Sequence, residues 1–233
     1  MLVCLSRQGA GRGDWPLSPR EPAAIRAALI EVGRRLHEQG LITAMEGNLS
    51  VRDGDAIYMT AAGVNKGTLL PEQVLRADLH GTLDEPSRYR LSSENLLHLE
   101  IYRRRVDVQA VVHAHPPAAT AFAVAHISLD RPLLAEAVLV LGRVPLVDYA
   151  PPSTPRLAQR VGEAVATADA MLLANHGAVA VGDGLDQAVE RMETLEHLAR
   201  VSLLAQLLGR ECPLPPAAVA ELLNLRAGGP PRR

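Results

Sequence analysis

The stretch MLLANHGAVAVG, residues 171–182, decides the fold of this 233-residue chain. Two short apolar runs flank Asn175-His176-Gly177, which predicts a strand, a tight turn and a second strand that returns beside the first. Gly177 is expected to supply the tight backbone of the turn. A hairpin indicates antiparallel pairing, so this sheet differs from the parallel sheets of dinucleotide-binding proteins, whose glycine-rich motif is also missing from the sequence.

Helix and strand patterns are interspersed on both sides of this hairpin. Further strands are predicted at residues 49–52, 56–60, 108–115 and 143–150. Helices are predicted at residues 18–40, 91–105, 154–168 and 185–209. Ser18 and Glu21 form a capping box for the first helix, and Ser92 or Ser93 caps the second. These elements together predict a mixed, largely antiparallel sheet with helices packed on it.

Composition predicts one domain and excludes several classes of partner. The formal net charge is −2 and the arginines are scattered, so neither nucleic acid nor an acidic membrane is an expected partner. Cys4 and Cys212 lie near opposite ends, which argues against a disulfide scaffold. With no signal-peptide pattern and no apolar run long enough to span a membrane, we expect a soluble cytoplasmic protein. The domain is expected at residues 17–212, with a flexible segment at 1–16 and a C-terminal extension at 213–233 whose tail is disordered.

Two histidines end an apolar run in the stretch VVHAHPP, residues 111–117. Alternate residues of a strand face the same side, so His113 and His115 are expected to project together and could share one metal ion. Alone, the pair fits equally well with histidines satisfied inside a core strand. His176, at the turn of the hairpin, offers a third ligand, and the three together favour a metal site.

Three other segments could hold an anion. In RLSSENLLHLE, residues 90–100, two hydroxyls stand where a helix begins, and its exposed N–H groups favour an anion. The loops EGNLSVR and TAAGVNKG contain Asn48, Gly63 and Lys66, which could surround a phosphate with backbone and side-chain donors. Simple helix capping and ordinary turns explain each segment equally well when it is taken by itself.

In this order, the motifs GNLSVR, TAAG, SSE, HAH and ANHG resemble the class II aldolase/adducin family, and within it the fuculose-1-phosphate aldolases, over about residues 20–210. The resemblance implies a three-layer α/β/α sandwich around a central, mostly antiparallel sheet, and a homotetramer with active sites between subunits. It also implies the site residues: the metal ligands His113, His115 and His176, the catalytic acid/base Glu94, and a phosphate pocket of Asn48, Gly63, Ser92 and Ser93. The implied ion is Zn²⁺, although three histidines also suit Mn²⁺, Co²⁺ or Fe²⁺.

The sequence departs from the fuculose-type pattern at two positions. Met45 stands where that pattern has a threonine, which removes one contact to the substrate phosphate. Glu136 stands near the position of a tyrosine that reaches across the subunit interface as a proton donor. Glu136 is therefore a second candidate catalytic residue, and a surface charge at a helix start is its ordinary alternative.

The resemblance implies a metal-dependent aldolase that cleaves a ketose 1-phosphate into dihydroxyacetone phosphate and an aldehyde through a metal-stabilised enediolate. A small sugar phosphate is thus the expected partner. The single lysine, Lys66, lies in a glycine-flanked loop, which argues against an aldolase that works through a lysine Schiff base. One alternative is a sugar-phosphate dehydratase or epimerase, similar to methylthioribulose-1-phosphate dehydratase. Another is a non-catalytic, adducin-like assembly module, although adducin-type members lack the metal histidines that this chain retains.

Overall fold

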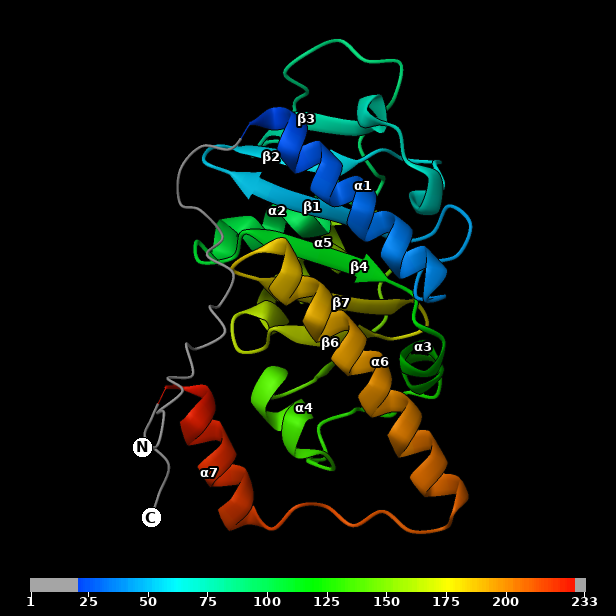
Figure 1. Cartoon of the computed structure of the whole chain (residues 1–233), viewed down its shortest axis with the longest axis vertical. Coiled ribbons are helices and arrows are strands. Elements are labelled where there is room, and N and C mark those ends of the chain that lie inside the picture. Colours follow the sequence, from blue (N-terminus) through cyan, green and yellow to red (C-terminus); the bar gives the residue numbers. More distant parts are fainter. Residues whose placement is uncertain (1–20, 229–233) are drawn as a thin grey trace, which may run out of the picture.

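A computed structural model describes residues 21–228, and these residues contain one seven-stranded sheet in the order β3-β2-β1-β4-β7-β6-β5 (Figure 1). The strands are β1 (Asn48–Asp53), β2 (Ala56–Thr60), β3 (Val74–Asp78), β4 (Ala110–Ala114), β5 (Leu146–Val147), β6 (Ala170–Leu173) and β7 (Gly177–Gly182). Every neighbouring pair is antiparallel except β5 with β6. The mostly antiparallel sheet predicted from the hairpins is therefore confirmed.

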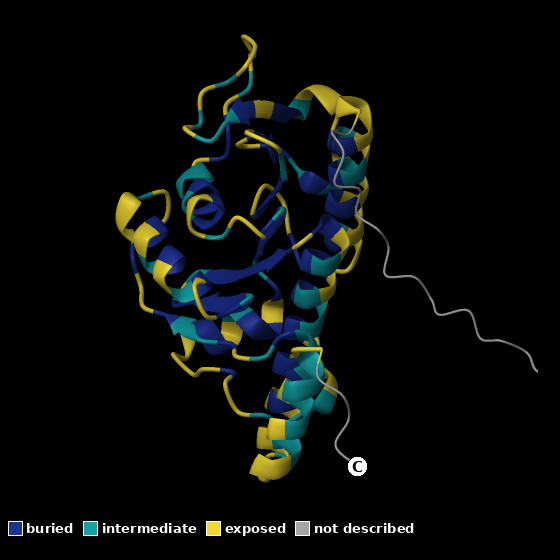
Figure 2. Ribbon diagram, turned by 90° about the vertical axis from the view of Figure 1, so that its left-hand side faces the viewer, coloured by how far each residue is buried: buried dark blue, intermediate teal, exposed yellow. Residues whose placement is uncertain are grey.

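Helices cover both faces of this sheet. They are α1 (Pro22–Glu38), α2 (Asn95–Arg104), α3 (Pro117–Val124), α4 (Ala135–Val140), α5 (Pro155–Val165), α6 (Leu185–Leu207) and α7 (Pro216–Arg226), with short 3₁₀ turns η1 (Lys66–Thr68) and η2 (Pro71–Gln73). Helices α1 and α6 cover one face of the sheet, and α2 and α5 cover the other (Figure 1). The apolar side chains of α1, α3, α4 and α6 belong to one core cluster, and those of α2 and α5 belong to a second cluster. Figure 2 shows the buried residues concentrated in the sheet and on the helix surfaces turned toward it. The predicted three-layer α/β/α architecture is confirmed.

The central hairpin forms as predicted, but its glycine serves another purpose. Asn175, not Gly177, takes the left-handed conformation in the turn, with φ of 55°. Gly177 is the first residue of β7, where an added Cβ would lie 2.6 Å from the carbonyl oxygen of Ala114 and 2.6 Å from the ring of His115. Real Cβ atoms do not approach other atoms so closely, so glycine is required at position 177 by the close approach of the Ala114 carbonyl and the His115 ring rather than by turn geometry.

Two predicted helix starts differ from the structure. The first helix begins at Pro22, and Ser18, its expected cap, lies outside the described residues. The second helix begins at Asn95 with Glu94 as its N-cap residue, so the prediction that Ser92 or Ser93 caps it is wrong. The chain passes the serines in a turn before the helix, because β-bridge pairing of Leu91 with Ala61 holds it there.

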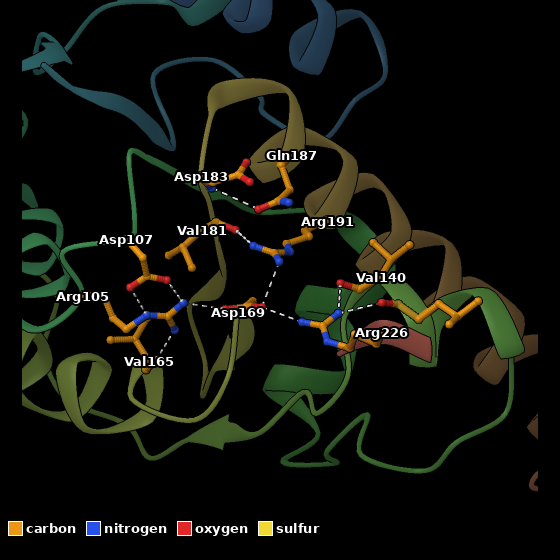
Figure 3. A network of polar contacts seen from close by, with 11 residues as sticks. Arg105, Asp107, Val140, Val165, Asp169, Val181, Asp183, Gln187, Arg191 and Arg226 are labelled. Carbon is orange, nitrogen blue, oxygen red and sulfur yellow. Dashed lines mark hydrogen bonds and ion pairs between the residues drawn. The ribbon is translucent and has the colours of Figure 1, made fainter. Parts of the chain in front are cut away.

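A polar cluster around Asp169 ties the C-terminal helix α7 to the rest of the protein (Figure 3). The Asp169 carboxylate lies 3.2 Å from Arg105, 2.9 Å from Arg191 and 2.5 Å from Arg226. Arg226, the last residue of α7, also donates to the carbonyl oxygens at the end of α4. The expected flexible segment at residues 1–16 and the last tail residues, 229–233, lie outside the described part of the chain. Within that part, no helix has the length and apolarity needed to cross a membrane.

Candidate metal centre

Strand pairing brings the predicted metal ligands together at one end of the sheet. His113 lies on β4, opposite Asn48 of β1 on one side and Val179 of β7 on the other. His115 follows the end of β4, where its backbone N–H donates to the carbonyl oxygen of Leu41. His176 lies in the turn between β6 and β7. Because β7 pairs with β4, this turn lies beside the end of β4, and residues 63 positions apart meet.

The three imidazoles form a compact triangle. Their ring centroids lie 4.8–5.0 Å apart, and one nitrogen of each ring lies within 4.8 Å of the others. His113 is fully buried, and its Nδ1 lies 2.9 Å from the carbonyl oxygen of Ala178, which leaves Nε2 directed at the other two rings. A backbone carbonyl that fixes the outer nitrogen is the usual support of a metal-binding histidine.

The residues present fit a divalent metal ion. Within residues 21–228, the buried Nδ1 atom of His176 and the buried Oε1 atom of Glu94 make no hydrogen bond, which is costly unless an ion or substrate engages the site. Burial, together with the charge of His113, lowers the pKa of His115 to about 3 and that of His176 to about 4. Both rings are therefore neutral at physiological pH, and neutral imidazole is the form that binds metal. Three histidines with an open position are a common donor set of catalytic zinc centres.

Glu94 lies directly beside this triangle. Its Oε2 is 3.0 Å from Nε2 of His113, and its Oε1 is 3.2 Å from Nε2 of His176. Asn48 donates to the same Oε2 at 3.1 Å. Burial alone would raise the pKa of Glu94, but the positive charge of His113 and the hydrogen bonds from His113 and Asn48 hold it well below its usual value. The Glu94 carboxylate is therefore ionised at neutral pH.

The predicted phosphate pocket divides into buried and exposed parts. Asn48 and Ser92 are buried next to Glu94, and the Ser92 hydroxyl accepts a hydrogen bond from the Glu94 backbone at 3.3 Å. Gly63 and Ser93 are exposed, and no Cβ contact would prevent a larger residue at position 63, although its φ of 67° favours glycine. The bridge between Ala61 and Leu91 places the loop of Gly63 beside the two serines. Gly63, Ser92 and Ser93 thus stand at neighbouring segments, as a phosphate pocket requires.

Lys66 is buried rather than solvated, being 2% exposed. Its ammonium group donates to the carbonyl oxygens of Met45 and Val64, each at 2.9 Å. Burial lowers the pKa of Lys66 to about 8, against a smaller opposing effect of Glu94. The lysine therefore holds the loop before β1, which leads into Asn48, against the loop after β2, which contains Gly63.

We expect Lys66→Met to destabilise the protein by about 1–3 kcal/mol at pH 7, because two buried carbonyl groups lose a charged donor. Between pH 8 and pH 10.5 the unfolded chain binds more protons at Lys66 than the folded protein does, so this residue makes wild-type stability rise with pH. Denaturant unfolding at pH 7 and pH 9.5 measures both effects. Arg88→Met, at an exposed position, is the control. If the difference in unfolding free energy between wild type and Lys66→Met were the same at both pH values, the lowered pKa assigned to Lys66 would be wrong.

Glu136 does not join the cluster. It is exposed in the first turn of α4, and no contact among the described residues connects it with Glu94 or the histidines. Three buried residues that sequence analysis overlooked lie closer to the chemistry. His98 bonds to Asn48, and Ser50 bonds to both His98 and Tyr102. Their spacing was visible, since positions 94, 98 and 102 share one face of a helix, but ordinary core packing produces the same spacing.

Comparison with known proteins is consistent with this geometry. The family model described as class II aldolase and adducin N-terminal domain matches residues 27–203. An L-fuculose phosphate aldolase of Methanococcus maripaludis is 34% identical over 75% of this chain and 94% of its own length. A 3-oxo-tetronate 4-phosphate decarboxylase of Escherichia coli is 34% identical over 76% of this chain and 85% of its own.

Solved structures agree. An L-fuculose-1-phosphate aldolase from Thermus thermophilus superimposes with a TM-score of 0.73 at 38% identity, covering 82% of this chain and 100% of its own. The sheet, the three-histidine site and these matches lead to one conclusion: the chain belongs to the class II aldolase and adducin N-terminal domain family, and it is a carbon–carbon lyase of the class II aldolase type.

Proposed function

We propose that this protein is a Zn²⁺-dependent aldolase that cleaves a ketose 1-phosphate into dihydroxyacetone phosphate and an aldehyde. The observation that carries the proposal is the position of the Glu94 carboxylate, 3.0 and 3.2 Å from two of the three clustered histidines. A divalent ion held by His113, His115 and His176 would supply Lewis-acid stabilisation of the oxyanion that develops as the carbon–carbon bond breaks.

Glu94 is the proposed acid/base. Cleavage between C3 and C4 leaves the bonding electron pair on the three-carbon fragment, and that fragment needs a proton at C3. An ionised carboxylate accepts this proton in the condensation direction and returns it in the cleavage direction. Asn48 donates a hydrogen bond to Oε2 of the carboxylate, whereas Oε1 accepts none from the described residues.

The proposed phosphate pocket consists of Asn48, Gly63, Ser92 and Ser93. Hydroxyl, amide and backbone N–H donors suit the oxygens of a phosphate group, and the buried ammonium of Lys66 adds a positive charge behind the loops. The pocket and Glu94 adjoin through Ser92, whose hydroxyl accepts from the Glu94 backbone. A ketose bound by its phosphate would thereby present its carbonyl end to the histidines.

In cleavage, the C4 hydroxyl must also lose its proton as the aldehyde forms, and Glu136 is the proposed acceptor of that proton and its donor in the condensation direction. Because Glu136 is exposed on α4 and lacks a contact with the described site residues of its own chain, it would act on a neighbouring subunit of a homotetramer. Glu136→Gln should then lower cleavage strongly. Heterotetramers of Glu136→Gln and Glu94→Gln chains should regain part of the activity, and a complete failure of such mixing would contradict sites shared between subunits.

The experiment that tests the function is a panel of phosphorylated substrates with separate detection of each product. Ketose 1-phosphates are assayed for dihydroxyacetone phosphate, and we expect its release from at least one of them. Chelation should stop the reaction, whereas borohydride plus substrate should not. Formation of a dehydrated or epimerised sugar without dihydroxyacetone phosphate would show that the protein is a dehydratase or an epimerase instead. Absence of both a bound divalent ion and any turnover would favour a non-catalytic assembly module.

Similarity to the decarboxylase of Escherichia coli supports a second candidate, decarboxylation of a phosphorylated 3-oxo acid. The two reactions share their central requirement, because each breaks a bond to the carbon beside a carbonyl and leaves the electron pair there. They differ in the leaving fragment, which is CO₂ in one case and an aldehyde in the other. Release of CO₂ from a phosphorylated 3-oxo acid, with no aldolase activity across the panel, would favour this candidate.

A further inference from the structure

A continuous chain of buried polar groups leads away from Glu94 between α2 and β1. Along α2, positions 94, 98 and 102 lie one turn apart on the same face, and along β1, Asn48 and Ser50 share one face of the strand. The two sets meet in the order Glu94, Asn48, His98, Ser50, Tyr102, each bonded to the next. Asn48, Ser50, His98 and Tyr102 are all at most 2% exposed, so water does not satisfy these groups.

The donors and acceptors in this chain allow one consistent direction. The ionised Glu94 carboxylate can only accept, so the Asn48 amide must turn its Nδ2 toward Glu94 and its Oδ1 toward His98. His98 must therefore carry its proton on Nε2. Burial lowers the pKa of His98 to about 3, so the ring is neutral and Nδ1 accepts. The Ser50 hydroxyl donates to that Nδ1 at 2.6 Å, and its own oxygen accepts from the Tyr102 hydroxyl at 2.7 Å.

We propose that His98 is a positioning residue which, backed by Ser50 and Tyr102, fixes the orientation of the Asn48 amide and through it the carboxylate of Glu94. With this orientation Nδ2 donates to Glu94, and its second hydrogen is available to a bound substrate. With the amide reversed, Oδ1 would face the carboxylate, and two acceptors would repel each other. The other tautomer of His98 would set its Nε2 lone pair against Oδ1, so the tautomer decides which orientation is stable.

This arrangement explains why polar residues occupy a position in the core that apolar residues could fill. Unpaired polar groups are costly to bury, and a fully paired chain avoids that cost while allowing a single arrangement. Asn and His side chains otherwise admit two orientations and two tautomers. A single amide orientation and a single tautomer keep the acid/base in a fixed position. This matters because even a small misplacement of a reacting group lowers the reaction rate.

The tautomer is tested directly by NMR on metal-free protein labelled with ¹⁵N-histidine, and this measurement needs no substrate. The signals of His98 are those that disappear in the spectrum of His98→Phe. We expect them to show a protonated Nε2 and an unprotonated Nδ1. A protonated Nδ1 in the wild-type protein would overturn the proposal. Ser50→Ala should shift the His98 nitrogen signals toward a mixture of tautomers, whereas Ser202→Ala, at another buried serine, should leave them unchanged.

The catalytic consequence rests on the proposed function and is tested separately. Ser50→Ala and Tyr102→Phe should lower kcat about tenfold, and His98→Phe about 10²-fold, with little change in KM and no loss of bound metal. Tyr58→Phe, at a buried tyrosine outside the chain, is the control for stability. His98→Gln, whose amide can donate to Asn48 again, should recover part of the loss. Equal kcat values for Ser50→Ala, Tyr102→Phe and Tyr58→Phe would refute the positioning role of the buried polar chain. The NMR measurement of the His98 tautomer does not depend on which substrate the panel identifies.

Discussion

Alanine in place of His113 is expected to leave the purified protein without its divalent ion and to lower kcat/KM by at least about 10³-fold, which corresponds to about 4 kcal/mol of lost transition-state stabilisation. His113 is the fully buried member of the triangle, and Ala178 already holds its outer nitrogen. The adjacent β4 residue Ala114 faces the opposite side of the sheet and offers no ligand atom, so the variant would retain two of the three imidazole donors.

Metal analysis and activity must be measured on the same preparation to separate loss of the ion from loss of the fold. His197→Ala, at an exposed histidine of α6, is the matched control and should keep both metal and activity. Addition of excess Zn²⁺, Mn²⁺, Co²⁺ or Fe²⁺ should not restore His113→Ala. A correctly folded His113→Ala protein that retains a stoichiometric ion and full activity would disprove the three-histidine site.

The histidine triangle was predictable because each of its parts leaves a local trace in the sequence. Alternation along a strand orients His113 and His115 together, and Asn-His-Gly between two apolar runs marks His176 as a turn residue. The pairing of β4 with β7 was needed to bring those parts together. No local rule decides which strands become neighbours, so the sequence indicated this pairing only through the resemblance of its ordered motifs to a known family.

The supporting residues were less predictable, because their roles depend on contacts across the fold. Lys66 looks like a loop lysine in the sequence, yet the packing of η1 against α1 buries it. His98 follows the spacing of any core residue on α2, and only its neighbour Ser50 on β1 reveals a polar partner. Gly177 suggests a turn in the sequence, but glycine is required there by a tertiary contact, the close approach of the Ala114 carbonyl and the His115 ring.

Some elements of the fold were not predicted, because their sequences lack a clear periodic pattern of apolar residues. Strand β3 and helix α3 are short, and their apolar residues lack a clear period. Helix α7 follows a proline-rich segment and buries none of its residues fully. Its last residue, Arg226, reaches Asp169 and the end of α4 (Figure 3). Such a helix depends on tertiary contacts rather than on an amphipathic pattern, so composition alone suggested only a tail.

Glutamine in place of Glu94 is expected to lower kcat by about 10²–10⁴-fold while the metal stays bound. Glutamine keeps the shape of the side chain and can still accept a hydrogen bond from Asn48 through its amide oxygen. It cannot accept a proton at neutral pH, so the step at C3 of the substrate is lost. The three histidines are unchanged, and metal content should equal that of the wild-type protein.

The proton step can be measured apart from bond cleavage. Dihydroxyacetone phosphate incubated with the wild-type enzyme in D₂O should exchange one C3 hydrogen for deuterium. Condensation begins with removal of this proton, and without an aldehyde the step reverses with deuterium from the solvent. Glu94→Gln should abolish the exchange. Glu136→Gln is the matched carboxylate variant, and it should keep the exchange while losing cleavage, since its proposed proton serves the aldehyde end. Normal exchange in Glu94→Gln would show that Glu94 only neighbours the metal site and that another base moves the proton.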